Sequence, residues 1–505
     1  MSLTNSDESI PLPAGTTPEI VRLDVAGIDR AKSYQLYVGR PAIYPKQAHG
    51  FFRTLKWRLM VITLAIYYLT PWVRWDRGPV LPDQAVLLDV ANGRIFFFGL
   101  EIWPQDFYLL TGVLVISALG LFLFTALFGR VWCGYFCPQT VWTDLMIAVE
   151  RFWQGDRNER IRLDRLPWSF SGGGAEKIIK KTATHLSWLM IAVATGGAFV
   201  FYFRDAPTLL REFVSGTAPM PAYVFLGLFT ATTYLLGGLA REQVCIYMCP
   251  WPRIQGALID RESLLVTYQE RRGEPRGAHK KGTSWEGRGD CIDCNACVAV
   301  CPTGVDIREG AQLECIHCAL CIDACNEIMA KVGRPANLIA YDTFSGLDAA
   351  KHGKTAPVRL VRPRTILYSA LIALVGGLML TALLNRSTLD VAVLADRNPQ
   401  FVSLSDGSIR NAFTLKLLNK RQEARTFVVS LSGLAGARLS IGGFEGQEQP
   451  RITVPADGGS EMRAFVRMSP ADLEHLVPGP QSYEIVVRDE ADGTLRRHGV
   501  TFRRP

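Results

Sequence analysis

Two cysteine-rich stretches decide the fold of this chain: residues 291–302 read CIDCNACVAVCP, and residues 315–326 read CIHCALCIDACN. In each stretch three cysteines are separated by two residues, and a fourth follows after three more. This is the ligand pattern of bacterial ferredoxins with two [4Fe-4S] clusters. Structural zinc sites made of four cysteines normally show paired Cys-x-x-Cys units instead. The sequence therefore predicts a bacterial-type ferredoxin module that holds two [4Fe-4S] clusters.

In such modules each motif gives three ligands to one cluster and its fourth cysteine to the other. We expect the first cluster to be held by Cys291, Cys294, Cys297 and Cys325, and the second by Cys315, Cys318, Cys321 and Cys301. The second motif ends in Cys325-Asn326 and lacks the usual proline, which affects the local loop geometry more than the ligation. Four cysteines suffice for a cluster, so we expect His317 to be a loop residue beside it.

Five apolar runs are long enough, or nearly so, to cross about 30 Å of hydrocarbon as helices. They are residues 59–73, 107–128, 186–203, 220–240 and 365–385. The first has only 15 uncharged residues, but Arg58 and Arg74 at its ends can extend their charged groups to the membrane interfaces. A further segment, 131–149, contains two cysteines, a proline and an aspartate, and we interpret it as an interfacial or loop segment.

Positive charge predicts the orientation of these spans. The connection 129–184 contains nine Lys and Arg residues, whereas the short connection after the third span contains only two. We therefore expect the N-terminus and the clusters on the cytoplasmic side of a bacterial inner membrane. Five spans then place the C-terminal region in the periplasm.

The motif Cys-x-Tyr-x-Cys-Pro occurs twice, each time after a hairpin of two predicted spans. The first copy contains Cys133 and Cys137, and the second contains Cys245 and Cys249, 112 residues later. The duplication places both cysteine pairs on the same, cytoplasmic face of the membrane. A helix would stack the two sulfurs of a pair on one side, whereas the proline would bend the chain there.

Four such thiols have three interpretations. They are buried small apolar residues, or a site for a soft metal or an iron–sulfur cluster, or a dithiol that cycles to a disulfide. Duplication at two membrane exits favours a metal or redox site over packing. The spacing does not choose between copper, a further cluster and a disulfide.

Beyond residue 386 the pattern changes to short alternating strands separated by Gly, Asp and Pro. We expect strands at residues 413–418, 426–431, 438–441, 461–468 and 482–488. Their number and spacing are typical of an immunoglobulin-like β-sandwich, although the Cys, Trp and Cys residues of antibody domains are absent. We interpret Met462 and Met468 as packing residues and not as copper ligands.

The predicted fold is a multi-domain membrane protein. Residues 1–55 form a cytoplasmic N-terminal segment, 56–265 a membrane domain with four transmembrane helices and both Cys-x-Tyr-x-Cys-Pro motifs, 266–363 a linker and the 2[4Fe-4S] ferredoxin-like domain, 364–386 the fifth transmembrane helix, and 387–505 a periplasmic Ig-like domain. The net charge of +8 is scattered or lies beside apolar runs, so it does not indicate nucleic-acid binding. All 12 cysteines lie between Cys133 and Cys325, which is not the pattern of a disulfide-rich secreted protein.

The combination of these parts resembles the CcoG/FixG/RdxA family of cytochrome c oxidase accessory proteins. Residues 301–310, CPTGVDIREG, and residues 331–341, KVGRPANLIAY, look like the most specific stretches of that family. The resemblance implies that the protein reduces Cu(II) to Cu(I), with copper as substrate, during assembly of the copper centre of cbb3-type cytochrome c oxidase. It implies that Cys133, Cys137, Cys245 and Cys249 are the catalytic residues and bind copper or a further metal.

Two other functions stay open from the sequence. The chain could be a quinol- or ferredoxin-linked electron-transfer subunit that feeds a periplasmic reductase, or a non-redox assembly scaffold whose sandwich holds the oxidase. The partners implied for the first function are subunits of the oxidase or its copper chaperones. The cytoplasmic electron donor, the oligomeric state and the cluster potentials do not follow from the sequence.

Overall fold

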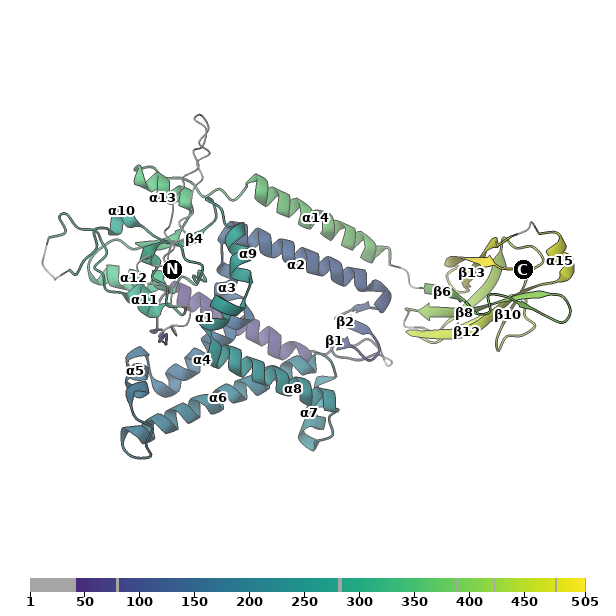
Figure 1. Cartoon of the computed structure of the whole chain (residues 1–505), viewed down its shortest axis with the longest axis horizontal. Coiled ribbons are helices and arrows are strands. Elements are labelled where there is room, and N and C mark those ends of the chain that lie inside the picture. The colour runs from purple at the N-terminus through teal and green to yellow at the C-terminus, as the bar shows by residue number, and fades with distance from the viewer. Residues whose placement is uncertain are drawn as a thin grey trace, which may run out of the picture. The chain divides into compact units, whose positions relative to one another are not determined.

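The computed structural model describes residues 42–78, 81–279, 284–386, 389–421, 423–476 and 479–504 (Figure 1). The chain divides into two compact units, Met1–Val73 with Gln84–Gly376, and Arg74–Asp83 with Gly377–Pro505. The first unit contains both types of cysteine motif and most of the long apolar helices. Most of the predicted N-terminal segment 1–55, up to residue 41, lies outside the described residues.

All five predicted spans are helical. They correspond to α1 (Phe51–Leu69) continued by η1 (Thr70–Trp72), η2 (Pro104–Asp106) with α2 (Phe107–Phe128), α6 (Gly173–Phe201), α8 (Met220–Thr232) continued by the π-helix η3 (Thr233–Ala240), and α14 (Pro363–Leu384). Within the described residues, four of these have the length and hydropathy of a membrane span, and α1 is not one of them. The first turns of α1 contain Arg53, Lys56 and Arg58, which shorten its apolar part.

The C-terminal end of α1 lies against the C-terminal end of α6. The Tyr67 hydroxyl donates to the Thr195 carbonyl oxygen (2.8 Å), and the Tyr202 hydroxyl donates to the Tyr67 carbonyl oxygen (2.9 Å). A small antiparallel sheet that the sequence analysis did not predict lies at the same end: β1 (Val86–Asp89), β2 (Arg94–Phe97) and β3 (Leu100–Ile102). The dipeptide Asn92-Gly93 between β1 and β2 is a hairpin signal that could have revealed it.

Shorter helices complete the membrane part of the first unit: α3 (Val131–Tyr135), α4 (Pro138–Gln154), α5 (Arg157–Arg165), α7 (Ala206–Ser215), the π-helix η4 (Val244–Met248) and α9 (Trp251–Leu258). The segment 131–149 is therefore helical apart from Phe136 and Cys137, so the loop alternative was wrong, whereas its interfacial position stays a prediction. It is not among the candidate spans, and α4 buries Asp144 and Glu150.

The ferredoxin module is closed by two antiparallel strands, β4 (Leu265–Tyr268) and β5 (Ile339–Asp342), that lie before and after the cysteine motifs in the chain. Between and after them come α10 (Glu270–Gly273), α11 (Ala296–Val300), η5 (Ile307–Glu309), α12 (Leu320–Lys331) and α13 (Phe344–Lys351). Val266, Ile322 and Leu338 form a buried core together with Cys291 and Cys297. The hydrophobic core of the module is thus built around its cysteines.

The missing proline of the second motif has a visible consequence. Cys301 ends α11 in an extended conformation (φ −69°, ψ 122°), because a residue before proline avoids the helical region. Asn326 imposes no such restriction. The helix α12 therefore continues past Cys325 to Lys331.

The second unit contains a β-sandwich. One sheet has the order β10-β12-β8-β6, with β7 also paired to β8, and the other has the order β11-β9-β13-β14. The elements are β6 (Leu389–Ala395), β7 (Val402–Ser403), β8 (Ile409–Asn419), β9 (Arg425–Ser432), β10 (Arg438–Ile441), β11 (Arg451–Val454), β12 (Gly458–Met468), α15 (Pro470–Glu474), β13 (Gln481–Asp489) and β14 (Leu495–Phe502). All five predicted strands are confirmed. Met468 is fully buried in the core between the sheets and Met462 packs against it, so both are packing residues.

Replacing Leu415 with alanine should lower the free energy of unfolding of the sandwich by about 2–5 kcal/mol, because this fully buried side chain fills the core. The measurement is urea unfolding of a fragment that spans residues 387–505, followed by circular dichroism. Leu394→Ala on the neighbouring strand is the matched control, since Leu394 is 55% exposed. Equal unfolding midpoints for the two variants would contradict the described core.

Candidate metal and redox site

The two cysteine-rich loops share an unusual backbone. In each loop the residues on both sides of the middle cysteine have positive φ: Asp293 (54°) and Asn295 (55°) in the first, His317 (51°) and Ala319 (61°) in the second. Ala319 has no side chain that favours this conformation, so the fold imposes it. Single left-handed residues turn backbone N–H groups to one side of a loop and create a concavity that suits a negatively charged group.

The cysteine side chains of the module lie in two neighbourhoods. Cys301, Cys315, Cys318 and Cys321 line one small internal cavity, which Cys297 also reaches. Cys325 interacts electrostatically with Cys297, Cys291 and Cys294. The structure thus brings each fourth cysteine to the three cysteines of the other motif, and none of the twelve cysteines forms a disulfide.

Burial dominates the chemistry of these thiols. It raises the pKa of Cys315 to about 12, with a further increase from the neighbouring Cys301, and it raises the pKa of Cys325 to about 12. Crowded thiolates are stable only with positive charge among them, which the iron of a cluster supplies. The backbone N–H of Val305 also donates to the sulfur of Cys301 (3.3 Å). The donor set and the loop backbone therefore fit two iron–sulfur clusters.

In the described part of the chain, no three Cys, His, Asp or Glu side chains are grouped closely enough to hold a single metal ion. In that part of the chain, the Cys-x-Tyr-x-Cys-Pro thiols are therefore not arranged around one ion.

The two Cys-x-Tyr-x-Cys-Pro segments share two backbone features, although the first lies in the α-helix α3 and the second in the π-helix η4. Four residues before the first cysteine of each copy, Gly129 (φ 59°, ψ −126°) and Arg241 (φ 44°, ψ −115°) adopt the same rare conformation. The N–H of the second cysteine donates to the carbonyl five residues earlier in both copies, Cys137 to Trp132 (2.9 Å) and Cys249 to Val244 (2.8 Å). The pairs therefore do not form a regular α-helical turn, and the chain bends at the cysteine that precedes each proline.

The first copy packs backbone against backbone on the second cysteine-rich loop. An added Cβ at Gly134 would lie 2.7 Å from the carbonyl oxygen of Ile316, so the two backbones touch. The Tyr135 hydroxyl donates to the carbonyl oxygen of Cys318 (3.0 Å). In the second copy Ile246 stands in the place of Gly134, and the side chain of Tyr247 is 66% exposed. The two halves of the repeat thus have different surroundings.

The four repeat thiols lie near one another. Cys245 interacts electrostatically with Cys137, Cys133 and Cys249, and burial raises its pKa to about 12. Burial also raises the pKa of Cys133 to about 11. The Cys133 thiol donates to the side-chain oxygen of Gln255 in α9, beyond the second copy (3.1 Å). The duplication therefore brings both cysteine pairs to one place.

Arg130 is a buried cation beside these sulfurs. It is 3% exposed and has no carboxylate within 4.0 Å among the described residues, and its guanidinium donates to Gln255 and to the Leu313 carbonyl oxygen. It interacts electrostatically with Cys133 and Cys315, one from each group of thiols. An uncompensated buried charge costs several kcal/mol, so thiolate-bound metal centres on its two sides would stabilise it.

His317 lies in the second motif as expected and is held by this arginine. The backbone N–H of Arg130 donates to Nδ1 of His317 (2.9 Å). Burial, together with the nearby charge of Arg130, lowers the pKa of His317 to about 3, so the ring is neutral. His317 is a residue of the cysteine-rich loop, as predicted, whereas the role of Arg130 was not predicted.

Two carboxylates connect α1 to this centre. Asp323, between Cys321 and Cys325, accepts hydrogen bonds from the backbone N–H groups of Phe52 (3.3 Å) and Arg53 (2.7 Å) at the start of α1. The guanidinium of Arg53 donates to both oxygens of Asp144 in α4 (2.9 Å each). Asp323, Gly134 and Gln255 were also missed by the sequence analysis. For Gly134 the signal was available, since it differs from Ile246 at the same place of the repeat.

Comparison with known proteins agrees with this architecture. Family models match a 4Fe-4S dicluster domain at residues 240–344, a 4Fe-4S binding domain at residues 110–154 and the Ig-like fold at the C-terminus of FixG at residues 379–505. The nitrogen fixation protein FixG of Rhizobium meliloti is 49% identical over 484 residues, which cover 90% of this chain and 91% of FixG. RdxA and RdxB of Cereibacter sphaeroides are 53% and 52% identical over 83% and 85% of this chain, and 88% and 90% of their own.

Replacing Gly134 with alanine should disturb the second cysteine-rich loop, because the new Cβ would meet its backbone and not a flexible side chain. We expect the iron content after anaerobic purification to fall from two clusters towards one. The matched control is Gly120→Ala in α2, where an added Cβ meets no atom within 4 Å. Full iron content in both variants would show that the second cysteine-rich loop binds its cluster without the close contact at Gly134.

Proposed function

We propose that this chain, which belongs to the family of FixG, RdxA and RdxB, reduces Cu(II) to Cu(I) for assembly of the copper centre of a cbb3-type cytochrome c oxidase. Its 4Fe-4S domains and apolar helices make it a membrane iron–sulfur electron-transfer protein. Copper is the proposed substrate, and the oxidase or its copper chaperones are the proposed partners.

One observation carries this proposal: the first Cys-x-Tyr-x-Cys-Pro turn touches the second cysteine-rich loop. Cys133 and Cys318 belong to the same buried group of side chains. The proposed cluster ligands are those assigned from the spacing, with Cys325 crossing to the first cluster and Cys301 to the second. Such clusters supply one electron at a time, which is the number needed to convert Cu(II) to Cu(I).

The repeat thiols suit copper as a substrate. Thiolates are soft ligands and favour Cu(I) over Cu(II), so Cys133, Cys137, Cys245 and Cys249 would stabilise the reduced product. Their sulfurs do not surround a single ion in the described structure. A centre that reduces copper and passes it on does not need a closed cage. The alternative is a further iron–sulfur cluster on these thiols, since a 4Fe-4S family model covers Cys133 and Cys137.

Five spans are the membrane topology that the contacts of α1 favour. The helix ends beside the end of α6, a candidate span, so both would run from the same face of the membrane to the other. The cations in the first turns of α1 would stay on the cytoplasmic side with the clusters. After α14 the Ig-like domain would then be periplasmic.

The central experiment is anaerobic. The purified protein is reduced, excess reductant is removed, Cu²⁺ is added, and EPR follows the reduced clusters while a Cu⁺-specific chelator reports the product. We expect one Cu⁺ for each electron that the clusters lose. Clusters that stay reduced in the presence of Cu²⁺ would refute the proposed reaction.

The double variant Cys245→Ser with Cys249→Ser should abolish copper reduction, because serine oxygens do not stabilise Cu(I) as thiolates do. Both ferredoxin clusters should remain, as measured by iron content and EPR. Met248→Ser is the control, since this exposed residue lies beside Cys249 and carries no thiol. Full activity of the double variant would remove these cysteines from the mechanism, and a loss of four irons would assign them to a further cluster.

Alkaline phosphatase fusions test the topology. We expect an active reporter after Gly93, between α1 and α2, and again after residue 390, because both positions would be periplasmic. A fusion after Gly287, within the ferredoxin module, should be inactive. An inactive reporter after Gly93 would show that α1 does not cross the membrane.

A further inference from the structure

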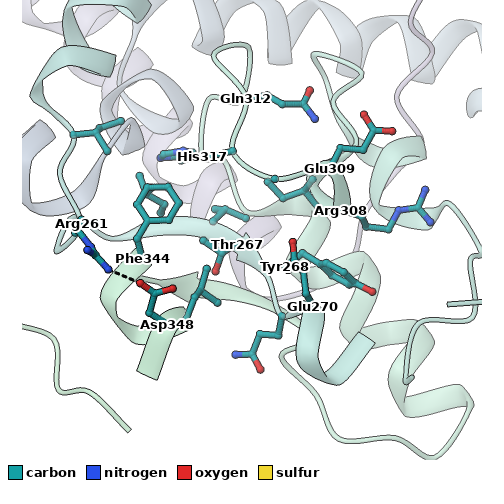
Figure 2. A pocket seen from close by; sticks show the side chains of 18 of the residues that line it. Arg261, Thr267, Tyr268, Glu270, Arg308, Glu309, Gln312, His317, Phe344 and Asp348 are labelled. Carbon is teal, nitrogen blue, oxygen red and sulfur yellow. Dashed lines mark hydrogen bonds and ion pairs between the residues drawn. The ribbon is translucent and has the colours of Figure 1, made fainter. Parts of the chain in front are cut away.

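A cavity of about 960 Å³ lies in the ferredoxin module and has no role in the proposed reaction (Figure 2). Residues of β4 and α13, among them Val266 and Phe344, contribute apolar lining, and Ile307 and Gln312 come from the segment between the two motifs. Its lining includes His317 of the second cysteine loop and Tyr268, which interacts electrostatically with Cys291 of the first loop.

His317 presents a fixed hydrogen-bond donor at this cavity. Its Nδ1 accepts the backbone N–H of Arg130, so this nitrogen carries no proton and the ring proton is on Nε2. The residue is 5% exposed, and its ring is part of the cavity lining, next to the ligand position Cys318 (Figure 2). A ligand with a carbonyl oxygen or a ring nitrogen would accept this hydrogen bond close to the second loop.

The lining of the cavity has an excess of positive charge. It contains six cations, Arg130, Arg261, Arg271, Arg272, Arg308 and Lys351, against three acidic residues, Glu270, Glu309 and Asp348. Three of the cations pair with carboxylates, as Arg261 does with Asp348. Within the described ranges, Arg130, Arg271 and Lys351 have no carboxylate partner within 4.0 Å. Because Asp290 and Asp306 outside the lining neutralise Arg272 and Arg308, and Arg130 faces the thiols, the exposed cations Arg271 and Lys351 are the ones that favour a ligand with negative charge.

We propose that this cavity binds a reduced flavin nucleotide as the electron donor of the protein. The flat ring system would lie against the apolar lining at Phe344 and accept the Nε2–H of His317, and the phosphate would be bound by Arg271 and Lys351. A quinol is also a two-electron donor of suitable size for the ring site, but it is neutral and would leave these cations without a counter-charge.

The inference rests on the proposed function, because it names the donor for the same electron path. On oxidation the flavin hydroquinone loses two electrons and two protons. One electron goes to each of the two centres that the eight cysteines would hold, and the protons go to solvent at the exposed carboxylates Glu270 and Glu309. The two-electron donor and the two one-electron acceptors therefore balance.

Binding is tested first, without turnover, on the full-length protein in detergent. Oxidised FMN is titrated, and quenching of its fluorescence reports the dissociation constant. Arg271→Ala and Lys351→Ala should each weaken binding about tenfold, through loss of one charge-assisted contact to phosphate. Lys354→Ala, three residues beyond Lys351 and outside the lining, should bind like the wild type. No FMN binding, or equal affinity in all variants, would overturn the proposal.

A redox test separates this inference from the proposed function. Reduced FMN is mixed anaerobically with oxidised protein, and one flavin should reduce two clusters. At limiting flavin concentration, the rate of cluster reduction should be lower in Lys351→Ala than in the wild type. Lys351→Ala reduced chemically should still convert Cu²⁺ to Cu⁺. Cluster reduction by decylubiquinol but not by reduced FMN would overturn the flavin site while the copper reaction stands. Failure of chemically reduced protein to reduce Cu²⁺, with FMN bound as expected, would refute only the proposed function.

Discussion

A contact between two backbones, at Gly134 and Ile316, is the constraint on which the rest of the first unit depends. It leaves no room for a side chain, so the turn after α2 and the second cysteine-rich loop lie directly against each other. The hydrogen bonds from Arg130 to His317 and from Tyr135 to Cys318 follow from this approach. The membrane helices and the ferredoxin module therefore form one body around two groups of thiols.

The buried charges of this body fall into two classes. Most are paired: Arg53 with Asp144, and Arg160 and Arg241 with Glu150 (3.0 Å each). Such pairs fix the relative positions of α1, α4 and the second repeat, and removing one partner would leave a costly isolated charge. Arg130 differs, because in the described structure it has no carboxylate within 4.0 Å and lies beside thiols and His317. The paired charges orient the helices, whereas Arg130 is placed where electrons would pass.

Local spacing predicted much of this molecule. A few neighbouring residues are enough to define the ferredoxin motifs, the duplicated cysteine pairs and the five predicted strands of the sandwich. The contacts that assemble them are not local. Gln255 is 122 residues from Cys133, and Tyr135 is 183 residues from Cys318. No periodicity in the sequence encodes such a long-range contact. The sheet β1–β3 is different, because its Asn-Gly turn is a local signal that was not used.

The carboxylate of Asp323 has a consequence for how the chain is made. It accepts the N–H of Arg53, which precedes it by 270 residues. During translation α1 leaves the ribosome long before Asp323 exists, so its first N–H groups must stay bound to water until the second cysteine motif has been synthesised and folded. Among the described helices, the first apolar one thus completes its N-terminal hydrogen bonds only after the second cysteine motif has been synthesised.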